Sequence, residues 1–156
     1  MTIMIVLDID NCISDDSWRV RYILKNEHVP FKKFHKYHSL CAFDISYPFA
    51  DYCHHIENGE SIAIITARPE LYKHLTEHWL DVNGWEYDYL IMRPDGNHFP
   101  SASSKMRAIL NLMATEREDI TMCYDDREDV LDVYEKLGLA TTRLSINEHI
   151  YSGYQP

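Results

Sequence analysis

Short continuous apolar runs alternate with longer amphipathic segments along this chain of 156 residues. The first run, Ile3-Met4-Ile5-Val6-Leu7, has the length and composition of a buried strand. Runs of this kind predict strands over residues 2–8, 61–65, 89–92, 120–124 and 139–144. Apolar residues at helical spacing, and the turn residues that end each segment, predict helices over residues 16–26, 31–40, 48–58, 68–82, 103–113 and 127–137.

This alternation of strands and helices indicates the fold class. In the predicted helix over residues 68–82, Leu71, Leu75, Trp79 and Val82 recur at helical spacing. Strands that alternate with helices form parallel sheets covered on both faces, and their crossovers are right-handed. We therefore expect a single α/β domain over residues 1–156, with a three-layer α/β/α, Rossmann-like parallel sheet.

Polar side chains follow three of the predicted strands. Asp8 and Asp10 come after the first strand, Thr66 after the second, and Asp125-Asp126 after the fourth. Ligands of open parallel sheets bind at the carboxyl ends of the strands, near the point where strand order reverses. The sequence therefore predicts a functional site at this edge. Taken alone, Thr66 is also compatible with a plain strand end, and Asp125-Asp126 with a helix N-cap.

The pair Asp8 and Asp10 carries the strongest chemical signal. Side chains two positions apart on a strand point the same way, so two like charges would meet in a cleft. Such a pair is tolerated when a divalent cation or a shared proton lies between the carboxylates. Magnesium and phosphate chemistry is one interpretation, and a solvated acidic turn is the other.

Composition limits the partners. The net charge of −10 disfavours a protein that grips long nucleic acid, but it permits a small anionic substrate or a chain end. No run approaches the roughly 20 apolar residues of a membrane helix, and the first residues do not resemble a secretory signal. The four cysteines show no C-x-x-C pair, which favours reduced thiols in a cytoplasmic protein.

The motifs resemble a known family. In order and strand context, Asp8-Ile9-Asp10, Thr66, Lys105 and Asp125-Asp126 are similar to the four motifs of the haloacid dehalogenase (HAD) superfamily of phosphatases. The resemblance spans nearly the whole chain and is strongest to the phosphatase domain of bacteriophage polynucleotide kinase and related small phage proteins. The segments that carry it further are residues 62–70, 92–96 and 124–127, together with Arg19.

The resemblance implies a HAD-type phosphomonoesterase that forms an aspartyl-phosphate on Asp8. Asp10 would protonate the leaving alcohol and then take a proton from the attacking water. Thr66 would donate hydrogen bonds to a phosphate oxygen, and Lys105 would stabilise the Asp8 carboxylate and the transferring group. Without the other motifs, Lys105 would be interpreted as a solvated lysine near a helix start.

The same resemblance implies a magnesium ion held by Asp8 and Asp10 and by Asp125 and Asp126, of which one of the last two is the direct ligand. It also implies that Arg19, Ala67 and Arg68 bind substrate.

The residues themselves leave two of these roles open. Arg68 is equally suited to fork onto a phosphate or to form a surface ion pair with Glu70. Arg19 also fits an ordinary amphipathic helix.

Three segments depart from the family pattern or extend it. Asn11-Cys12 replaces the usual Gly-Thr, and an asparagine tolerates the left-handed backbone that glycine would supply. Residues 97–101 lack the arginine and aspartate with which the phage enzyme recognises a polynucleotide end. Residues 15–47 stand where larger relatives carry a cap domain, and they predict a small helical insert. Its histidines at 35 and 38 are interpreted as surface residues or pocket wall rather than zinc ligands.

We therefore expect a nucleotide phosphatase, whose substrate is a nucleoside 5'- or 3'-monophosphate or the 3'-phosphate end of a polynucleotide. An open cleft under a partial lid suits a bulky substrate or closure by a second copy in a homo-oligomer. The alternatives are a general small-metabolite phosphatase of the same superfamily and a non-catalytic nucleotide-binding module.

Overall fold

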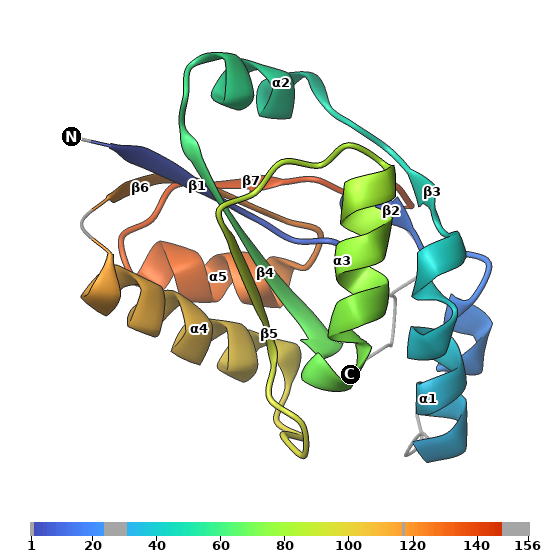
Figure 1. The fold of residues 1–156 in the computed structure, drawn as a ribbon. Coiled ribbons are helices and arrows are strands. Elements are labelled where there is room, and N and C mark those ends of the chain that lie inside the picture. Colours follow the sequence, from blue (N-terminus) through green and yellow to red (C-terminus); the bar gives the residue numbers. More distant parts are fainter. Residues whose placement is uncertain (1, 24–30, 117, 148–156) are drawn as a thin grey trace.

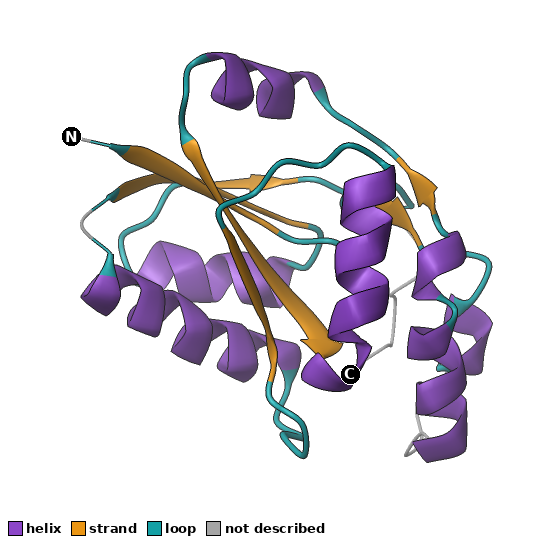
Figure 2. Ribbon diagram, in the orientation of Figure 1, coloured by secondary structure: helices purple, strands orange, loops and turns teal. Residues whose placement is uncertain are grey.

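A parallel five-stranded sheet forms the middle layer of the computed structural model, which describes residues 2–23, 31–116 and 118–147 (Figures 1 and 2). Its strand order is β5-β4-β1-β6-β7, and all four pairings are parallel. The strands are β1 (Ile3–Leu7), β4 (Ser61–Pro69), β5 (Tyr89–Arg93), β6 (Asp119–Asp125) and β7 (Thr141–Arg143). The expected strands are confirmed, with boundaries that shift by up to four residues.

Helices cover both faces of the sheet (Figure 1). They are α4 (Ser101–Thr115) and α5 (Glu128–Lys136) on one face, and α2 (Ala50–Glu57) and α3 (Lys73–Val82) on the other. The alternation of side chains along β1 divides the core accordingly. Val6 packs in a cluster with Ile109 of α4, whereas Leu7 packs in a cluster with Trp79 of α3. The three-layer α/β/α fold is thus confirmed.

The strand order reverses at β1. The chain passes from β1 to β4 and β5 on one side, and then crosses to β6 and β7 on the other. The carboxyl ends of β1 and β6 are neighbours, with Leu7 paired to Tyr124. Asp8 and Asp125 therefore lie side by side at the switch point, where ligands of such sheets bind.

A small insert leaves the sheet after β1 and returns before α2. Its base is an antiparallel pair of short strands, β2 (Ser14–Asp15) and β3 (Ile45–Ser46). Between them lie the 3-10 helices η1 (Val20–Tyr22) and η2 (Cys41–Phe43) and the helix α1 (Phe31–Ser39).

The predicted helix over residues 16–26 is wrong within the described part, because only η1 is helical there. The Arg19 side chain turns inward to two carboxylates, which a solvated amphipathic helix would not allow. Residues 24–26 lie outside the described residues.

The predicted helix over residues 68–82 begins later than expected. β4 continues through Arg68 and Pro69, η3 (Glu70–Tyr72) follows, and α3 starts at Lys73. A residue before proline is disfavoured in the helical region, which keeps Arg68 extended. The later start also changes the buried face. Trp79 is buried, but Leu71 and Val82 are 53% and 68% exposed.

Among the described residues, no helix combines the length and the apolar character needed to cross a membrane.

Candidate active site

A pocket opens at the carboxyl edge of the sheet. Its walls combine strand ends, α4 and the insert, and they include Asp8, Asp10, His38, Ala67, Lys105 and Asp126. Residues that are far apart in the sequence are brought together here, because the ends of β1, β4 and β6 share one edge. A pocket therefore lies at the sheet edge where the sequence predicts a functional site.

Three buried carboxylates form one cluster in this pocket. Asp8, Asp125 and Asp126 each offer an oxygen, and these oxygens lie within 4.8 Å of one another. Burial, and then the charge of Asp125, raises the pKa of Asp8 to about 6. Burial and the charge of Asp8 raise the pKa of Asp126 well above its usual value. A set of oxygen donors with excess negative charge fits a hard divalent cation such as magnesium.

Lys105 is the cation inside this cluster. Its Nζ donates to Asp8 Oδ1 at 2.8 Å and to Asp125 Oδ2 at 2.6 Å. The side chain is 3% exposed. Burial opposes its charge, but Asp125 and Asp8 outweigh that effect and raise the pKa of Lys105 well above its ordinary value. The helix that carries it starts at Ser101, two residues before the predicted start.

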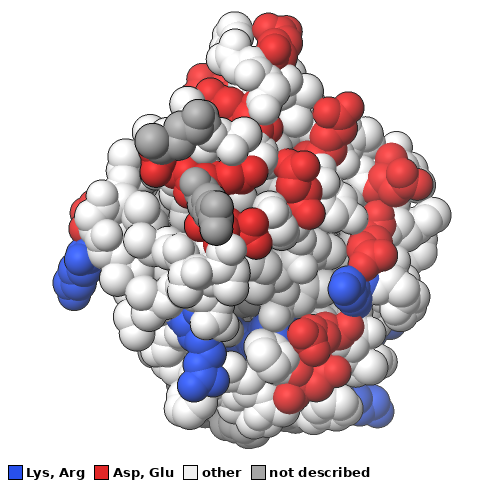
Figure 3. Space-filling model, turned by 60° about the vertical axis from the view of Figure 1, so that its left-hand side comes forward, with Lys and Arg blue, Asp and Glu red and all other residues white. Residues whose placement is uncertain are grey.

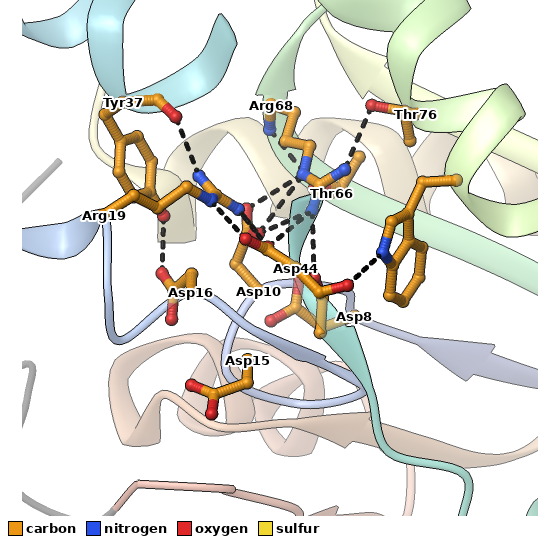
Figure 4. Close-up of polar contacts among 12 residues, drawn as sticks. Asp8, Asp10, Asp15, Asp16, Arg19, Tyr37, Asp44, Thr66, Arg68 and Thr76 are labelled. Carbon is orange, nitrogen blue, oxygen red and sulfur yellow. Dashed lines mark hydrogen bonds and ion pairs between the residues drawn. The ribbon is translucent and has the colours of Figure 1, made fainter. Parts of the chain in front are cut away.

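Asp10 belongs to a different environment from Asp8 (Figure 4). Its Oδ1 accepts from Arg19 Nη2 at 2.7 Å and from Arg68 Nη2 at 2.7 Å. Burial alone would raise the pKa of Asp10, but Arg68 and Arg19 outweigh burial and lower it. Asp10 is absent from the three-carboxylate cluster found in the described residues. β1 ends at Leu7, so the two-residue period of a strand does not extend to residue 10.

Asp44 completes the second environment. Its carboxylate accepts from Arg19 Nε at 2.8 Å, from Arg19 Nη2 at 2.6 Å and from the Ser14 hydroxyl at 2.6 Å. The side chains of Asp44, Arg19 and Arg68 are fully buried. Of the two roles left open for Arg68, the surface pair with Glu70 is wrong, because its guanidinium pairs with Asp10 and Asp44 in this buried network. Neither guanidinium is among the residues that line the pocket.

The turn after β1 has the expected backbone form. Asn11 has a φ of 59°, the left-handed conformation that asparagine tolerates. Its side-chain Nδ2 donates to Asp126 Oδ2 at 3.2 Å, which ties this turn to the end of β6. Cys12 is buried, and burial raises its pKa well above the usual value, so its thiol is poorly suited to act as a nucleophile.

Thr66 and Ala67 lie on β4, and Thr66 lines a second pocket that shares Arg93 and Lys105 with the first. Thr66 is 3% exposed, and its Oγ1 accepts from the Arg68 backbone N–H at 3.2 Å. The Thr66 hydroxyl proton therefore remains available as a donor. Ala67 lines the first pocket directly.

Sequence reasoning gave no role to two residues with places at the site, Asp44 and Arg93, and of the two alternatives left open for His38 the pocket wall is the one found. Asp44 gave no motif, although it is an acid within the otherwise apolar segment Cys41–Ile45. Arg93, buried at the end of β5, donates to Ser101 Oγ at 3.2 Å and lines the pocket. His38 lines it from α1. Arg127 and Asp129 form a local ion pair at 2.9 Å.

Comparison with solved structures establishes the fold. A chain of the Pnkp1/Rnl/Hen1 RNA repair complex matches with a TM-score of 0.72 and 18% identity over 94% of this chain, which spans only 44% of that one. A class C acid phosphatase from Bacillus anthracis, with tungstate bound, matches with a TM-score of 0.63 and 16% identity over 94% of this chain and 68% of that one.

The name of a third similar structure refers to the haloacid dehalogenase superfamily. A Bacteroides fragilis protein assigned to the haloacid dehalogenase-like hydrolases matches with a TM-score of 0.61 and 14% identity over 99% of this chain and 94% of that one. No curated protein sequence matches this chain.

A family model, described as the LNS2 domain of PITM 1-3, matches residues 49–146. The match contains Thr66, Lys105, Asp125 and Asp126, whereas Asp8 and Asp10 precede it. Since it covers more than half of the sequence, this chain belongs to the LNS2 domain family, and its fold is that of the haloacid dehalogenase superfamily.

Proposed function

We propose that this protein is a magnesium-dependent phosphomonoesterase that works through an aspartyl-phosphate on Asp8. The observation that carries the proposal is the placement of Asp8. Its carboxylate lies at the switch point of the sheet, 2.8 Å from Lys105 Nζ and beside two further buried acids. A carboxylate in this position is exposed to the pocket and has a cation at hand to offset the charge of an incoming phosphate.

Asp8, Asp125 and Asp126 would hold the magnesium ion, which would offset the negative charge of the phosphate so that a carboxylate can approach it. In the first step an Asp8 oxygen bonds to phosphorus and the bond to the leaving alcohol breaks. Lys105 fixes the orientation of Asp8 and supplies positive charge beside the transferring group. The Thr66 hydroxyl, with the backbone near Ala67, donates to the phosphate oxygens. In the second step water attacks phosphorus and releases Asp8.

Asp10 moves the protons of both steps. Arg19 and Arg68 hold it as a carboxylate, the form that can accept a proton from the attacking water, and they lower its strength as a base. Donation of a proton to the leaving alcohol requires Asp10 to be protonated first and is the more demanding step. We therefore assign Arg19 and Arg68 as positioning residues for Asp10, in place of the direct substrate contact implied by resemblance.

A nucleotide is the proposed substrate class, either a mononucleotide or the 3'-phosphate end of a polynucleotide. The fold likeness to a chain of an RNA repair complex supports the chain end. The net charge of −10 argues against extensive contact with a polynucleotide backbone, and Asp and Glu also outnumber Lys and Arg on the face of the molecule in Figure 3. The insert, residues 15–47, then serves as a partial lid within a single domain.

The test is phosphate release in magnesium from 5'- and 3'-nucleoside monophosphates, a 3'-phosphorylated oligonucleotide and p-nitrophenyl phosphate. Asp8→Asn should abolish turnover of every substrate while the far-UV circular dichroism spectrum stays unchanged. Hydrolysis of p-nitrophenyl phosphate without preference for nucleotides would indicate a general small-metabolite phosphatase. Substantial turnover by Asp8→Asn would remove Asp8 from the role of nucleophile. Nucleotide binding without any hydrolysis by the wild-type chain would indicate a non-catalytic module.

A further inference from the structure

One buried polar atom of a residue that lines the pocket has no hydrogen-bond partner among the described residues and no role in the proposed chemistry. His38 is 4% exposed and lines the pocket that contains Asp8 and Lys105. Its Nδ1 is buried and has no hydrogen-bond partner among the described residues. A buried polar atom without a partner costs free energy, so such atoms in a pocket are candidates for contact with a ligand.

Aromatic neighbours hold the His38 ring in place. The ring stacks on Tyr72 with centroids 5.1 Å apart, and it meets Phe34 edge-on at 4.5 Å and Tyr37 edge-on at 4.7 Å. The adjacent His35 Nδ1 lies 2.7 Å from the Tyr72 hydroxyl, which also secures α1 against the core. His38 is therefore a group fixed before a ligand arrives, and little rotamer entropy is lost when it makes a hydrogen bond.

The environment also fixes the charge state of the ring. Burial lowers the pKa of His38 well below its usual value, and Arg19, Arg68 and Arg93 act in the same direction against Asp10. A neutral imidazole has one donor nitrogen and one acceptor nitrogen. It is suited to a neutral hydroxyl or ether oxygen, whereas Lys105 already faces the position of the phosphate.

His38 lies on the side of the pocket where Asp10 is found. One guanidinium joins them, because Arg19 Nη2 donates to Asp10 at 2.7 Å and Arg19 Nη1 donates to the backbone carbonyl of Tyr37, the residue before His38, at 3.1 Å (Figure 4). In the proposed reaction Asp10 donates a proton to the leaving alcohol. The alcohol part of the ester therefore passes close to the His38 ring.

We propose that His38 is a specificity-determining residue that hydrogen-bonds the leaving alcohol, and that the site selects phosphate esters of polyols and sugars, nucleotides included. These alcohols carry a hydroxyl or ring oxygen on a carbon next to the esterified one. This inference rests on the proposed phosphatase function. Esters with a plain hydrocarbon alcohol leave the imidazole without a partner and are disfavoured.

The test compares glycerol 1-phosphate with propyl phosphate, which share a carbon skeleton and differ in their hydroxyl groups. In the wild-type chain kcat/KM should be higher for glycerol 1-phosphate by about 3- to 10-fold, the value of one neutral hydrogen bond. His38→Phe keeps the ring contacts and should reduce this preference to near unity, with kcat/KM for propyl phosphate changed less than about 2-fold. His38→Asn or His38→Gln should restore part of the preference.

His35→Phe is the matched control, because His35 lies on the same helix as His38 but does not line the pocket. The variant loses the hydrogen bond between His35 and Tyr72. It should leave the preference unchanged. If His38→Phe and His35→Phe lower kcat/KM equally for both esters, His38 only supports the insert and the proposal is overturned. An unchanged preference in His38→Phe would mean that the ring bonds solvent and would also overturn it. If the wild-type chain releases phosphate from neither ester nor from p-nitrophenyl phosphate, the phosphatase function itself fails.

Discussion

Replacement of Asp44 by asparagine is expected to destabilise the fold and misplace Asp10 together. The Asp44 side chain is fully buried and accepts from Arg19 Nε and Nη2, at 2.8 and 2.6 Å. Its other partners are the Ser14 hydroxyl at 2.6 Å and Trp18 Nε1 at 2.9 Å. In Asp44→Asn the carboxamide keeps one acceptor oxygen, and its amino group faces groups that are themselves donors.

The magnitude follows from the buried charge left behind. Loss of one partner of a buried ion pair costs about 3–5 kcal/mol. Arg19 retains Asp10 as a partner, so the lower end, about 3 kcal/mol, is expected here. Glu77→Gln is the control, because Glu77 and Lys73 form an exposed pair at 3.8 Å, worth at most about 0.5 kcal/mol.

Urea unfolding of the two variants tests this estimate. With a slope of about 1–3 kcal/mol per molar urea, the midpoint of Asp44→Asn should fall by roughly 1–3 M while that of Glu77→Gln stays near the wild-type value. Phosphate release by the folded Asp44→Asn protein should also decrease, because Arg19 no longer holds Asp10 in a fixed direction. A midpoint for Asp44→Asn within about 0.3 M of the wild type would refute the view that this network supports the fold.

Three further outcomes are expected at the acidic cluster and at Asp10. Asp126→Asn should raise the free energy of unfolding by about 1 kcal/mol without metal, since it removes one of three mutually repelling carboxylates. It should also reduce the rise in Tm that magnesium produces, and an undiminished rise would contradict the ligand assignment. EDTA should abolish activity and magnesium restore it, whereas calcium should support it poorly because of its looser coordination; activity that persists in chelator would argue against the metal. Asp10→Asn should release one equivalent of p-nitrophenol per enzyme in a burst and then stall, because an aryl leaving group needs no proton but the attacking water does; steady turnover at the wild-type rate would exclude Asp10 as the base.

The residues at the strand ends could be predicted from the sequence, because each is marked by the apolar run that directly precedes it. Asp8, Thr66 and Asp125 follow directly on apolar runs, and a parallel sheet places such positions on one edge. No long-range contact had to be known beyond the class of the fold. The left-handed Asn11 was likewise predictable, since few residue types tolerate that backbone conformation.

The insert could not be predicted in the same way. Arg19 and Asp44 lie 25 positions apart, and each stands next to a helix of only three residues. No periodic pattern in the sequence joins them. The proline after Arg68 accounts for its extended backbone, but no local pattern indicated that its side chain would pair with Asp10, 58 positions away. Tertiary pairing decided the partners of these side chains.

The two acids of the first motif show why residue type alone does not assign a role. Asp8 shares its surroundings with two other carboxylates and one ammonium group, which leaves excess negative charge when all are ionised, and its pKa rises to about 6. Asp10, two positions later, shares two guanidinium groups with Asp44, and its pKa falls. Environments that move the pKa values of two carboxyl groups in opposite directions in this way give the two groups different roles. The first is suited to meet a cation and a phosphorus atom, and the second to remain an anion that removes a proton. Arg19 and Asp44, which complete the network around Asp10, both belong to the insert, so the chemistry depends on the insert as much as on the sheet.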